Sequence, residues 1–150
     1  MDDEWLQSAD HHLIARGDDD FPELLEQIPR APERLYVTGN VECLHMPALA
    51  IVGSRNPTEA GRRTAFEFAR HLGAAGICIV SGLAEGIDTA AHRGALEAGA
   101  ATVAFLGHGI DRVYPASNHE LAHQVAAHGA LVSEFPLGTP PGRALFPQRN

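Results

Sequence analysis

Four short apolar runs recur along the chain at nearly regular intervals, and this repetition limits what the chain can fold into. Their starts, at residues 48, 77, 101 and 130, lie 29, 24 and 29 residues apart. The runs read ALAIVGS, ICIVSG, ATVAFLG and ALVSE. In each run, the residues that would point to either face of a strand are mostly apolar. Strands that are covered on both faces of a sheet have this pattern. We therefore expect four parallel strands in one sheet.

The segments between these runs are typical of amphipathic helices. Apolar residues recur at helical spacing within residues 58–76, 88–99 and 118–129. Each segment begins with a residue suited to an N-cap, namely Thr58, Asp88 and Asn118, and each reaches a glycine at its end. The alternation predicts an α/β fold, a Rossmann-like parallel sheet with helices on both faces. Right-handed connections bring all four carboxyl ends of the strands to one edge.

The residues before this repeat differ in composition. Residues 1–20 end in GDDD, and we expect an acidic tail or the remnant of a helical domain there. Residues 21–47 form a lead-in segment, in which Pro22, Pro29 and Pro32 limit the chain to a short helix and an extended stretch. The stretch RLYVTG (34–39) is predicted to be an edge strand. Residues 48–150 then form the main domain.

Charge is distributed unevenly along the 150 residues. Residues 1–47 hold 3 Arg against 11 Asp and Glu, which accounts for the whole net charge of −8. Residues 48–150 hold 8 Arg and 8 Asp or Glu, and the chain has no lysine. Since a guanidinium matches phosphate better than an ammonium does, a neutral domain with clustered arginines remains able to bind a polyanion.

Composition also bears on location and metal content. No apolar run approaches the roughly 18 residues of a membrane span, and the acidic N-terminus is unlike a signal peptide. Cys43 and Cys78 lack metal-ligand spacing, and Cys78 falls in an apolar run. We expect a cytoplasmic protein with no membrane contact, no cofactor and no metal. His119 and His123 are one helical turn apart, but a solvated helix face explains them better than a metal site.

Small residues collect at the predicted carboxyl ends of the strands. These ends read GSR (53–55), SGLAEG (81–86), GHGIDRVYP (107–115) and SEFP (133–136). Ligands of open α/β sheets bind outside this edge, glycine permits close approach to the backbone, and helix N-termini attract anions. An anion, most simply a phosphate, is the ligand that this pattern favours.

Three classes of site compete for these residues. Ser81, Asp88 and His92 invite a hydrolase interpretation, but no G-x-S-x-G elbow surrounds Ser81, and Asp88 suits an N-cap better. The stretch GHGIDR has Arg112 where a dinucleotide fingerprint needs its third glycine. Arg55 follows a strand directly and either contacts a ligand or pairs with Asp88 or Asp111.

The closing segment PPGRALFPQRN favours a single-stranded nucleic acid. It places Arg143 and Arg149 near Phe146, and arginines interleaved with an aromatic ring suit phosphates and a stacked base. Phe146 as an ordinary core residue is the alternative.

Six motifs in order carry a family resemblance. The segments AIVGSRNPTEAG, VSGLAEGIDTAAHRGAL, ATVAFLGHGIDRVYP, an N…L pair, GALVSEFPLG and FPQRN resemble the Rossmann-like domain of the DNA-processing protein DprA (Smf) family. The resemblance implies a non-enzymatic protein that binds and protects single-stranded DNA and helps load the RecA recombinase in natural transformation. It also implies a homodimer, and a domain that is incomplete at its C-terminus in this chain.

The resemblance also assigns roles to residues. The DNA-binding set it implies is Gly53, Ser54, Arg55, Ser81, Gly82, Gly107, Gly109, Arg143, Phe146, Arg149 and Asn150. The residues expected to hold the loops in shape are Asp88, His92, Asp111 and Tyr114. Ser81 is thereby interpreted as a phosphate contact through its backbone and hydroxyl. The alternative is an enzyme of a related Rossmann-like group that binds or hydrolyses nucleoside monophosphates, although its P-G-G-x-G-T-x-x-E run is absent.

Overall fold

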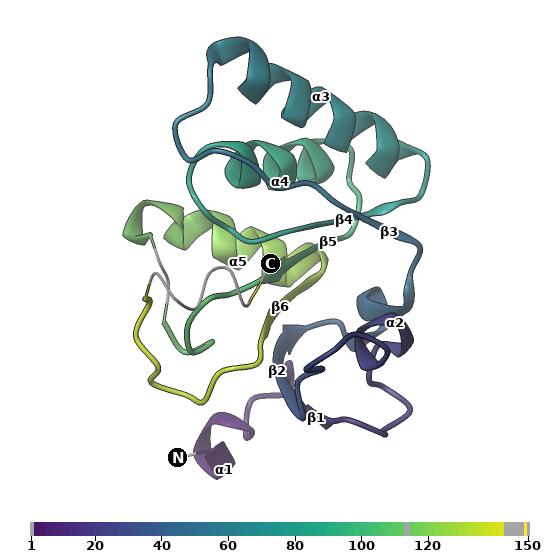
Figure 1. The fold of residues 1–150 in the computed structure, drawn as a ribbon, viewed down its shortest axis with the longest axis vertical. Coiled ribbons are helices and arrows are strands. Elements are labelled where there is room, and N and C mark those ends of the chain that lie inside the picture. Colours follow the sequence, from purple (N-terminus) through teal and green to yellow (C-terminus); the bar gives the residue numbers. More distant parts are fainter. Residues whose placement is uncertain (1, 113–114, 143–148, 150) are drawn as a thin grey trace.

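A six-stranded mixed sheet organises the molecule (Figure 1). This computed structural model describes residues 2–112, 115–142 and 149, and the strand order across its sheet is β1-β2-β6-β5-β4-β3. The four predicted parallel strands are β3 (Ala48–Ala50), β4 (Cys78–Ser81), β5 (Thr102–Phe105) and β6 (Ala130–Ser133). They pair in parallel, each with its neighbour, so the predicted α/β architecture is confirmed.

Three long helices cover one face of the sheet. They are α3 (Glu59–Ala74), α4 (Ile87–Glu97) and α5 (His119–His128), and the 3-10 turn η2 (Ala116–Asn118) leads into α5. Figure 1 shows α3 lying along α4. Gly94 permits this close packing, because a Cβ at that position would meet the carbonyl of Phe66 and lie 3.0 Å from the Cβ of Ala69.

The helix starts agree with the sequence in part. Thr58 caps α3, and its Oγ1 accepts a hydrogen bond from the Gly61 N–H at 3.0 Å. The prediction for Asp88 is wrong, since α4 begins one residue earlier, after Gly86, which has a φ of +83° that suits glycine. Asn118 stands at the start of α5 without a side-chain capping bond, because its amide is used elsewhere.

The N-terminal third belongs to the same sheet. It contains α1 (Asp2–Trp5), β1 (His11–Ala15), α2 (Glu23–Glu26), β2 (Arg34–Gly39) and the 3-10 turn η1 (Val41–His45). Residues 1–20, where a tail or helical remnant was expected, hold the short helix α1 and also the strand β1. The edge position predicted for β2 is wrong: β2 pairs antiparallel with β6 on one side and with β1 on the other. Both differences come from pairing between distant segments, which local patterns do not report.

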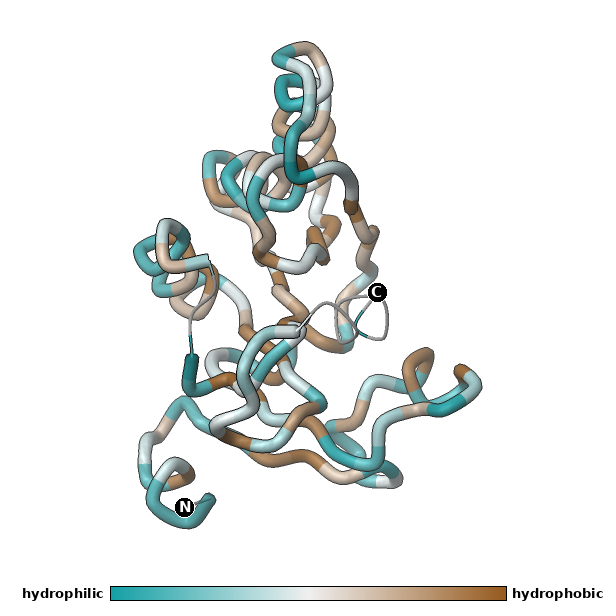
Figure 2. The backbone as a smooth tube through the Cα atoms, turned by 60° about the vertical axis from the view of Figure 1, so that its left-hand side comes forward, coloured by the Kyte–Doolittle hydropathy of each residue, from teal (hydrophilic) through white to brown (hydrophobic). Residues whose placement is uncertain are grey.

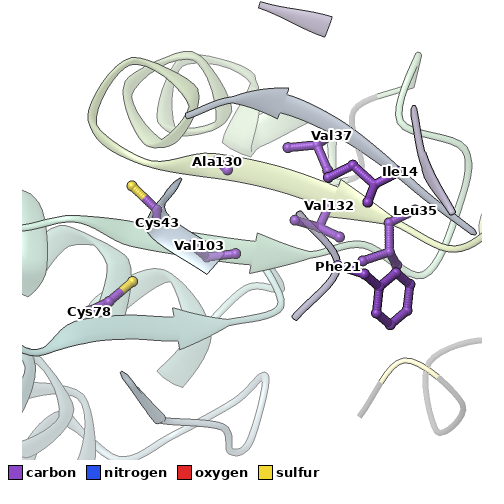
Figure 3. Packing of buried hydrophobic residues seen from close by; sticks show 9 residues of the cluster. All are labelled: Ile14, Phe21, Leu35, Val37, Cys43, Cys78, Val103, Ala130 and Val132. Atoms are coloured by element: carbon purple, nitrogen blue, oxygen red, sulfur yellow. The ribbon is translucent and has the colours of Figure 1, made fainter. Parts of the chain in front are cut away.

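The second face of the sheet is covered by short segments rather than long helices. Its core includes Phe21, Leu35 and Cys43, packed on strand residues such as Val103 and Val132. Figure 3 shows these side chains coming from β2, β5, β6 and the lead-in segment. Helical segments thus flank both faces, as predicted, but α2 and η1 are much smaller than the three helices opposite.

The two cysteines lie in this second core. Cys43 and Cys78 are free and buried, and burial raises the pKa of the Cys78 thiol to about 11.

Along the chain, apolar stretches run through the interior, whereas the segment beside the N label is largely hydrophilic (Figure 2). In the described part of the chain, none of the helices has the length and apolar character needed to cross a lipid bilayer.

Candidate nucleic-acid interface

The carboxyl ends of β3, β4 and β5 meet around a small pocket, which we call the strand-end pocket. Its volume is about 70 Å³. The residues lining it are Arg55, Gly82, Ala84, Glu85, Gly107, His108, Pro115 and Arg149. Four of the predicted binding residues, Arg55, Gly82, Gly107 and Arg149, are therefore brought together, although they are spread over 95 positions of the sequence.

The backbone of Gly82 hydrogen-bonds to two charged side chains. Its N–H donates to Asp88 Oδ2 at 3.1 Å, and its carbonyl accepts a hydrogen bond from Arg149 Nη1 at 2.9 Å. A Cβ on residue 82 would lie 2.5 Å from Arg149 Nη1 and 2.8 Å from Asp88 Oδ2. Only glycine leaves room for both groups, because any larger residue at position 82 would clash with Asp88 and Arg149.

Asp88 and Arg149 share a partly desolvated environment. Burial raises the pKa of the Asp88 carboxyl, while Arg149 and hydrogen bonds from the neighbouring backbone oppose that rise. Burial likewise lowers the pKa of Arg149, Asp88 counteracts this, and the nearby positive charge of Arg55 lowers it further. Arg55 and Arg149 thus repel one another across the pocket. An anion bound between them would relieve that repulsion.

The turn after β3 is held in place by backbone contacts to α4. The Ser54 carbonyl accepts a hydrogen bond from the Ile87 N–H at 3.1 Å, and Ser54 Oγ accepts one from the Asn56 N–H at 3.0 Å. A Cβ on Gly53 would lie 2.8 Å from the Ile87 side chain. Gly53 and Ser54 therefore shape the turn that presents the exposed Arg55, and they do not line the strand-end pocket themselves.

Ser81 and His92 are each engaged in other contacts. Ser81 Oγ donates to the Ile51 carbonyl at 2.5 Å. His92 is fully buried, and its Nε2 accepts a hydrogen bond from the Leu83 N–H at 3.2 Å while its Nδ1 contacts Thr102 Oγ1 at 2.8 Å. Burial lowers the pKa of His92 to about 3. Ser81 therefore directs its hydroxyl proton towards the Ile51 carbonyl oxygen, and His92 holds the β4–α4 turn.

The two glycines that follow β5, Gly107 and Gly109, have different roles. Gly107 lines the strand-end pocket, but Gly109 does not: its N–H donates to the Thr139 carbonyl at 2.9 Å. Asp111 Oδ1 accepts a hydrogen bond from the Gly138 N–H at 2.8 Å, which joins two loops. His108, between the two glycines, is almost wholly buried, yet it lines the pocket and was not among the predicted residues.

A second missed residue is Asn118. Its side-chain amide donates to the Leu83 carbonyl and to Thr89 Oγ1, each at 2.9 Å. It therefore ties the start of α5 to the β4–α4 turn and fixes the pocket wall. A buried amide within a helix-start motif looks like a cap in the sequence, and only the three-dimensional structure reveals its other use. Glu85, also missed, adds a carboxylate to the lining and contacts Ser117.

Some predicted residues fall outside the described residues, namely Tyr114, Arg143, Phe146 and Asn150. Their roles stay predictions. The His119 and His123 Nε2 atoms lie 3.3 Å apart on the exposed side of α5. Across residues 2–112, 115–142 and 149, no group of three or more His, Cys, Asp or Glu side chains could hold a metal ion.

Comparisons with known proteins agree on one family. The family described as DNA recombination-mediator protein A matches residues 12–150. The Smf protein of Synechocystis is 40% identical over 148 residues, which cover 96% of this chain and 37% of that relative. The chain thus spans well under half the length of that relative.

Two solved structures share the fold closely. DNA processing protein A from Streptococcus pneumoniae matches with a TM-score of 0.86 and 36% identity, over 99% of this chain and 53% of that one. DNA processing protein A from Helicobacter pylori matches with a TM-score of 0.83 and 28% identity, over 93% of this chain and 62% of that one. The Helicobacter protein is described as having a unique single-stranded DNA binding mode.

Proposed function

This chain belongs to the DNA recombination-mediator protein A family, and from that membership we propose that it binds single-stranded DNA at the strand-end pocket. The observation that carries the proposal is the convergence of Arg55 and Arg149 beside Gly82 and Gly107. Arg149 is held by a backbone carbonyl, whereas Arg55 is exposed on the opposite side of the pocket. Two guanidinium groups around a glycine-lined hollow match the charge and size of a backbone phosphate.

The size of the pocket favours contact with a phosphate over enclosure of a nucleotide. Pockets that enclose small molecules typically measure about 300–1,000 Å³, whereas the strand-end pocket measures about 70 Å³. A phosphodiester group fits such a hollow while its sugar and base stay outside. Gly82 and Arg149 also line a neighbouring cavity of about 770 Å³. The size of the strand-end pocket therefore bears on where a phosphate binds, and not on the alternative, hydrolysis of nucleoside monophosphates.

We propose further that the chain acts without an enzymatic reaction. The support is that Ser81 and His92, the pair that suggested a hydrolase, hydrogen-bond to Ile51 and to Leu83 and Thr102 respectively. For the complete protein we extend the proposal to protection of incoming DNA, help in loading RecA, and a cytoplasmic homodimer. These parts rest on the family resemblance alone.

The decisive experiment is a titration of a fluorescent oligothymidine, measured by anisotropy at two salt concentrations. We expect wild type to bind and to weaken with salt, since each neutralised phosphate contributes about 0.7 to the slope of log K against log salt. Arg55→Ala should lose roughly tenfold in affinity and show a shallower slope. Arg70→Ala is the matched control, because Arg70 lies on α3 paired with Glu67 at 2.7 Å and away from the pocket.

Each alternative has its own outcome. If the folded chain does not bind at low salt, the proposal is wrong. If Arg55→Ala and Arg70→Ala weaken binding equally, DNA binds through general charge and not at the strand-end pocket. Release of free base from a nucleoside 5′-monophosphate would instead support the enzymatic alternative.

A further inference from the structure

A second positively charged hollow lies between α3 and α4. We call it the arginine hollow, and its volume is about 440 Å³. Arg62 and Arg63 of α3 face Arg93 of α4 across it, and Phe66 contributes an apolar part of the lining. All three arginines are exposed. None of them was singled out by the sequence patterns around the strand ends.

The positive charge in this hollow is only partly neutralised. Arg62 pairs weakly with Glu59, at 3.9 Å between highly exposed groups. Glu67 lies near Arg63, but its hydrogen bond at 2.7 Å goes to Arg70. Within the described residues, no carboxylate lies within 4.0 Å of the guanidinium of Arg63 or Arg93. Exposed guanidinium groups that face a shared hollow without close partners are suited to binding an anion.

The arginine hollow adjoins the strand-end pocket. The segment 82–90 separates them: Gly82, Ala84 and Glu85 line the pocket, and Gly86 and Thr89 line the hollow. Gly86 packs directly under the turn that carries Arg55, because a Cβ there would meet the Ser54 carbonyl and lie 2.8 Å from the Arg55 carbonyl carbon. Gly86, which lines the arginine hollow, thus touches the turn that carries Arg55, which lines the strand-end pocket.

We propose that the arginine hollow is a second phosphate-contact region for the same DNA strand. Arg63 and Arg93 contact backbone phosphates of nucleotides beyond those at the strand-end pocket, and the two regions together set the length of DNA that the protein covers. Grooves of positive charge that follow a flexible backbone are the usual way to bind single strands without sequence preference. This second region presupposes the single-stranded DNA binding proposed above.

Oligonucleotide length separates the two regions. We would titrate the 150-residue chain with oligothymidines of about 5 and about 25 nucleotides, which lie near the lower end of typical site sizes and above their upper end. The variant Arg63→Ala/Arg93→Ala should bind the short oligonucleotide like wild type and lose roughly fivefold to tenfold on the long one. Its salt slope on the long oligonucleotide should fall by about 0.7 for each phosphate that an arginine no longer neutralises.

Two further variants control for charge and folding. Arg16→Ala/Arg34→Ala removes the same formal charge at exposed positions outside the arginine hollow and should bind both lengths like wild type. Arg63→Lys/Arg93→Lys keeps the charge and should retain most of the affinity for the long oligonucleotide. Circular dichroism of each variant establishes that it is folded.

The outcomes distinguish this inference from the proposed function. If wild type binds neither length, the single-stranded DNA function fails and the second region with it. If wild type binds both and Arg63→Ala/Arg93→Ala matches it on both, only the arginine hollow is excluded. A loss of equal size on both lengths also overturns the inference, as does a loss shared by Arg16→Ala/Arg34→Ala. Unchanged DNA binding would make an acidic protein surface the better candidate partner for the hollow.

Discussion

The floor and the rim of the strand-end pocket differ in burial and in what their side chains contact. By the floor we mean the buried polar groups that hold the β4–α4 turn, whose residues line the pocket. These groups are His92, Asp88 and Asn118, and their partners are backbone atoms of that turn. The rim is the turn that carries the exposed Arg55. Buried polar groups cost free energy when their hydrogen-bond partner is removed, whereas exposed charges contribute little to folding. The residues that hold the fold therefore differ from those proposed to bind DNA, and substitutions can separate the two roles.

Removal of the His92 imidazole from the floor should reduce the stability of the fold more than the other substitutions below. His92→Ala leaves the Leu83 N–H without its acceptor and opens a cavity in a fully buried site. We expect the free energy of unfolding to fall by about 3–5 kcal/mol, measured by urea denaturation. His119→Ala, an exposed histidine on α5, should change it by less than about 0.5 kcal/mol. If the two substitutions lowered the free energy of unfolding equally, His92 would contribute no more to stability than an exposed histidine.

The pH dependence of folding should report the same buried imidazole. The fold lowers the pKa of His92 from 6.5 to about 3, so the unfolded chain binds more protons between these values. The stability that neutral His92 contributes is complete above pH 6.5 and is lost as the pH falls from there towards 3. Asp88, whose pKa is raised, acts in the opposite direction: its contribution is present at low pH and is lost as the pH rises through its folded pKa.

Urea denaturation between pH 7 and pH 4 checks this prediction. The histidine can add up to about 1.4 kcal/mol per pH unit to the slope of stability against pH. His92→Gln keeps an acceptor for the Leu83 N–H but does not titrate, so its profile should be flatter than that of wild type by about this amount. Parallel profiles for the two proteins would mean that His92 is not held neutral by the fold.

The smallest effect on stability belongs to the rim. Arg55→Ala should change the free energy of unfolding by no more than about 0.5 kcal/mol, because the side chain is exposed. The same urea titration, run beside wild type at one pH, measures this. A loss of several kcal/mol would show that the rim also holds the fold, and the reduced DNA affinity expected of this variant would then have a structural cause.

Local patterns predicted the parallel half of the fold well and the antiparallel half poorly. The apolar runs and the Thr58 cap mark β3 to β6 and α3 because their signals lie within a few neighbouring residues. The pairing of β1 with β2, and of β2 with β6, depends on segments that are far apart in sequence. Strand order depends on such contacts, and periodicity carries no information about them.

The candidate site shows the same division. Glycine at a strand end predicted the pocket at Gly82 and Gly107, but glycine alone does not distinguish a pocket wall from a turn, and Gly53 and Gly109 belong to turns. His108 was missed because one buried histidine between two glycines has no periodic signature. Ser81 is close to the pocket, yet its hydroxyl donates to Ile51.

The burial of both cysteines makes the protein well suited to chemical labelling. Cys43 and Cys78 are shielded from solvent, and burial raises the pKa of both thiols, so neither reacts readily with a maleimide at neutral pH. A cysteine introduced at an exposed rim position, for example by Asn56→Cys next to Arg55, would then be modified alone. A dye attached there would report occupancy of the strand-end pocket without either native cysteine having to be replaced first.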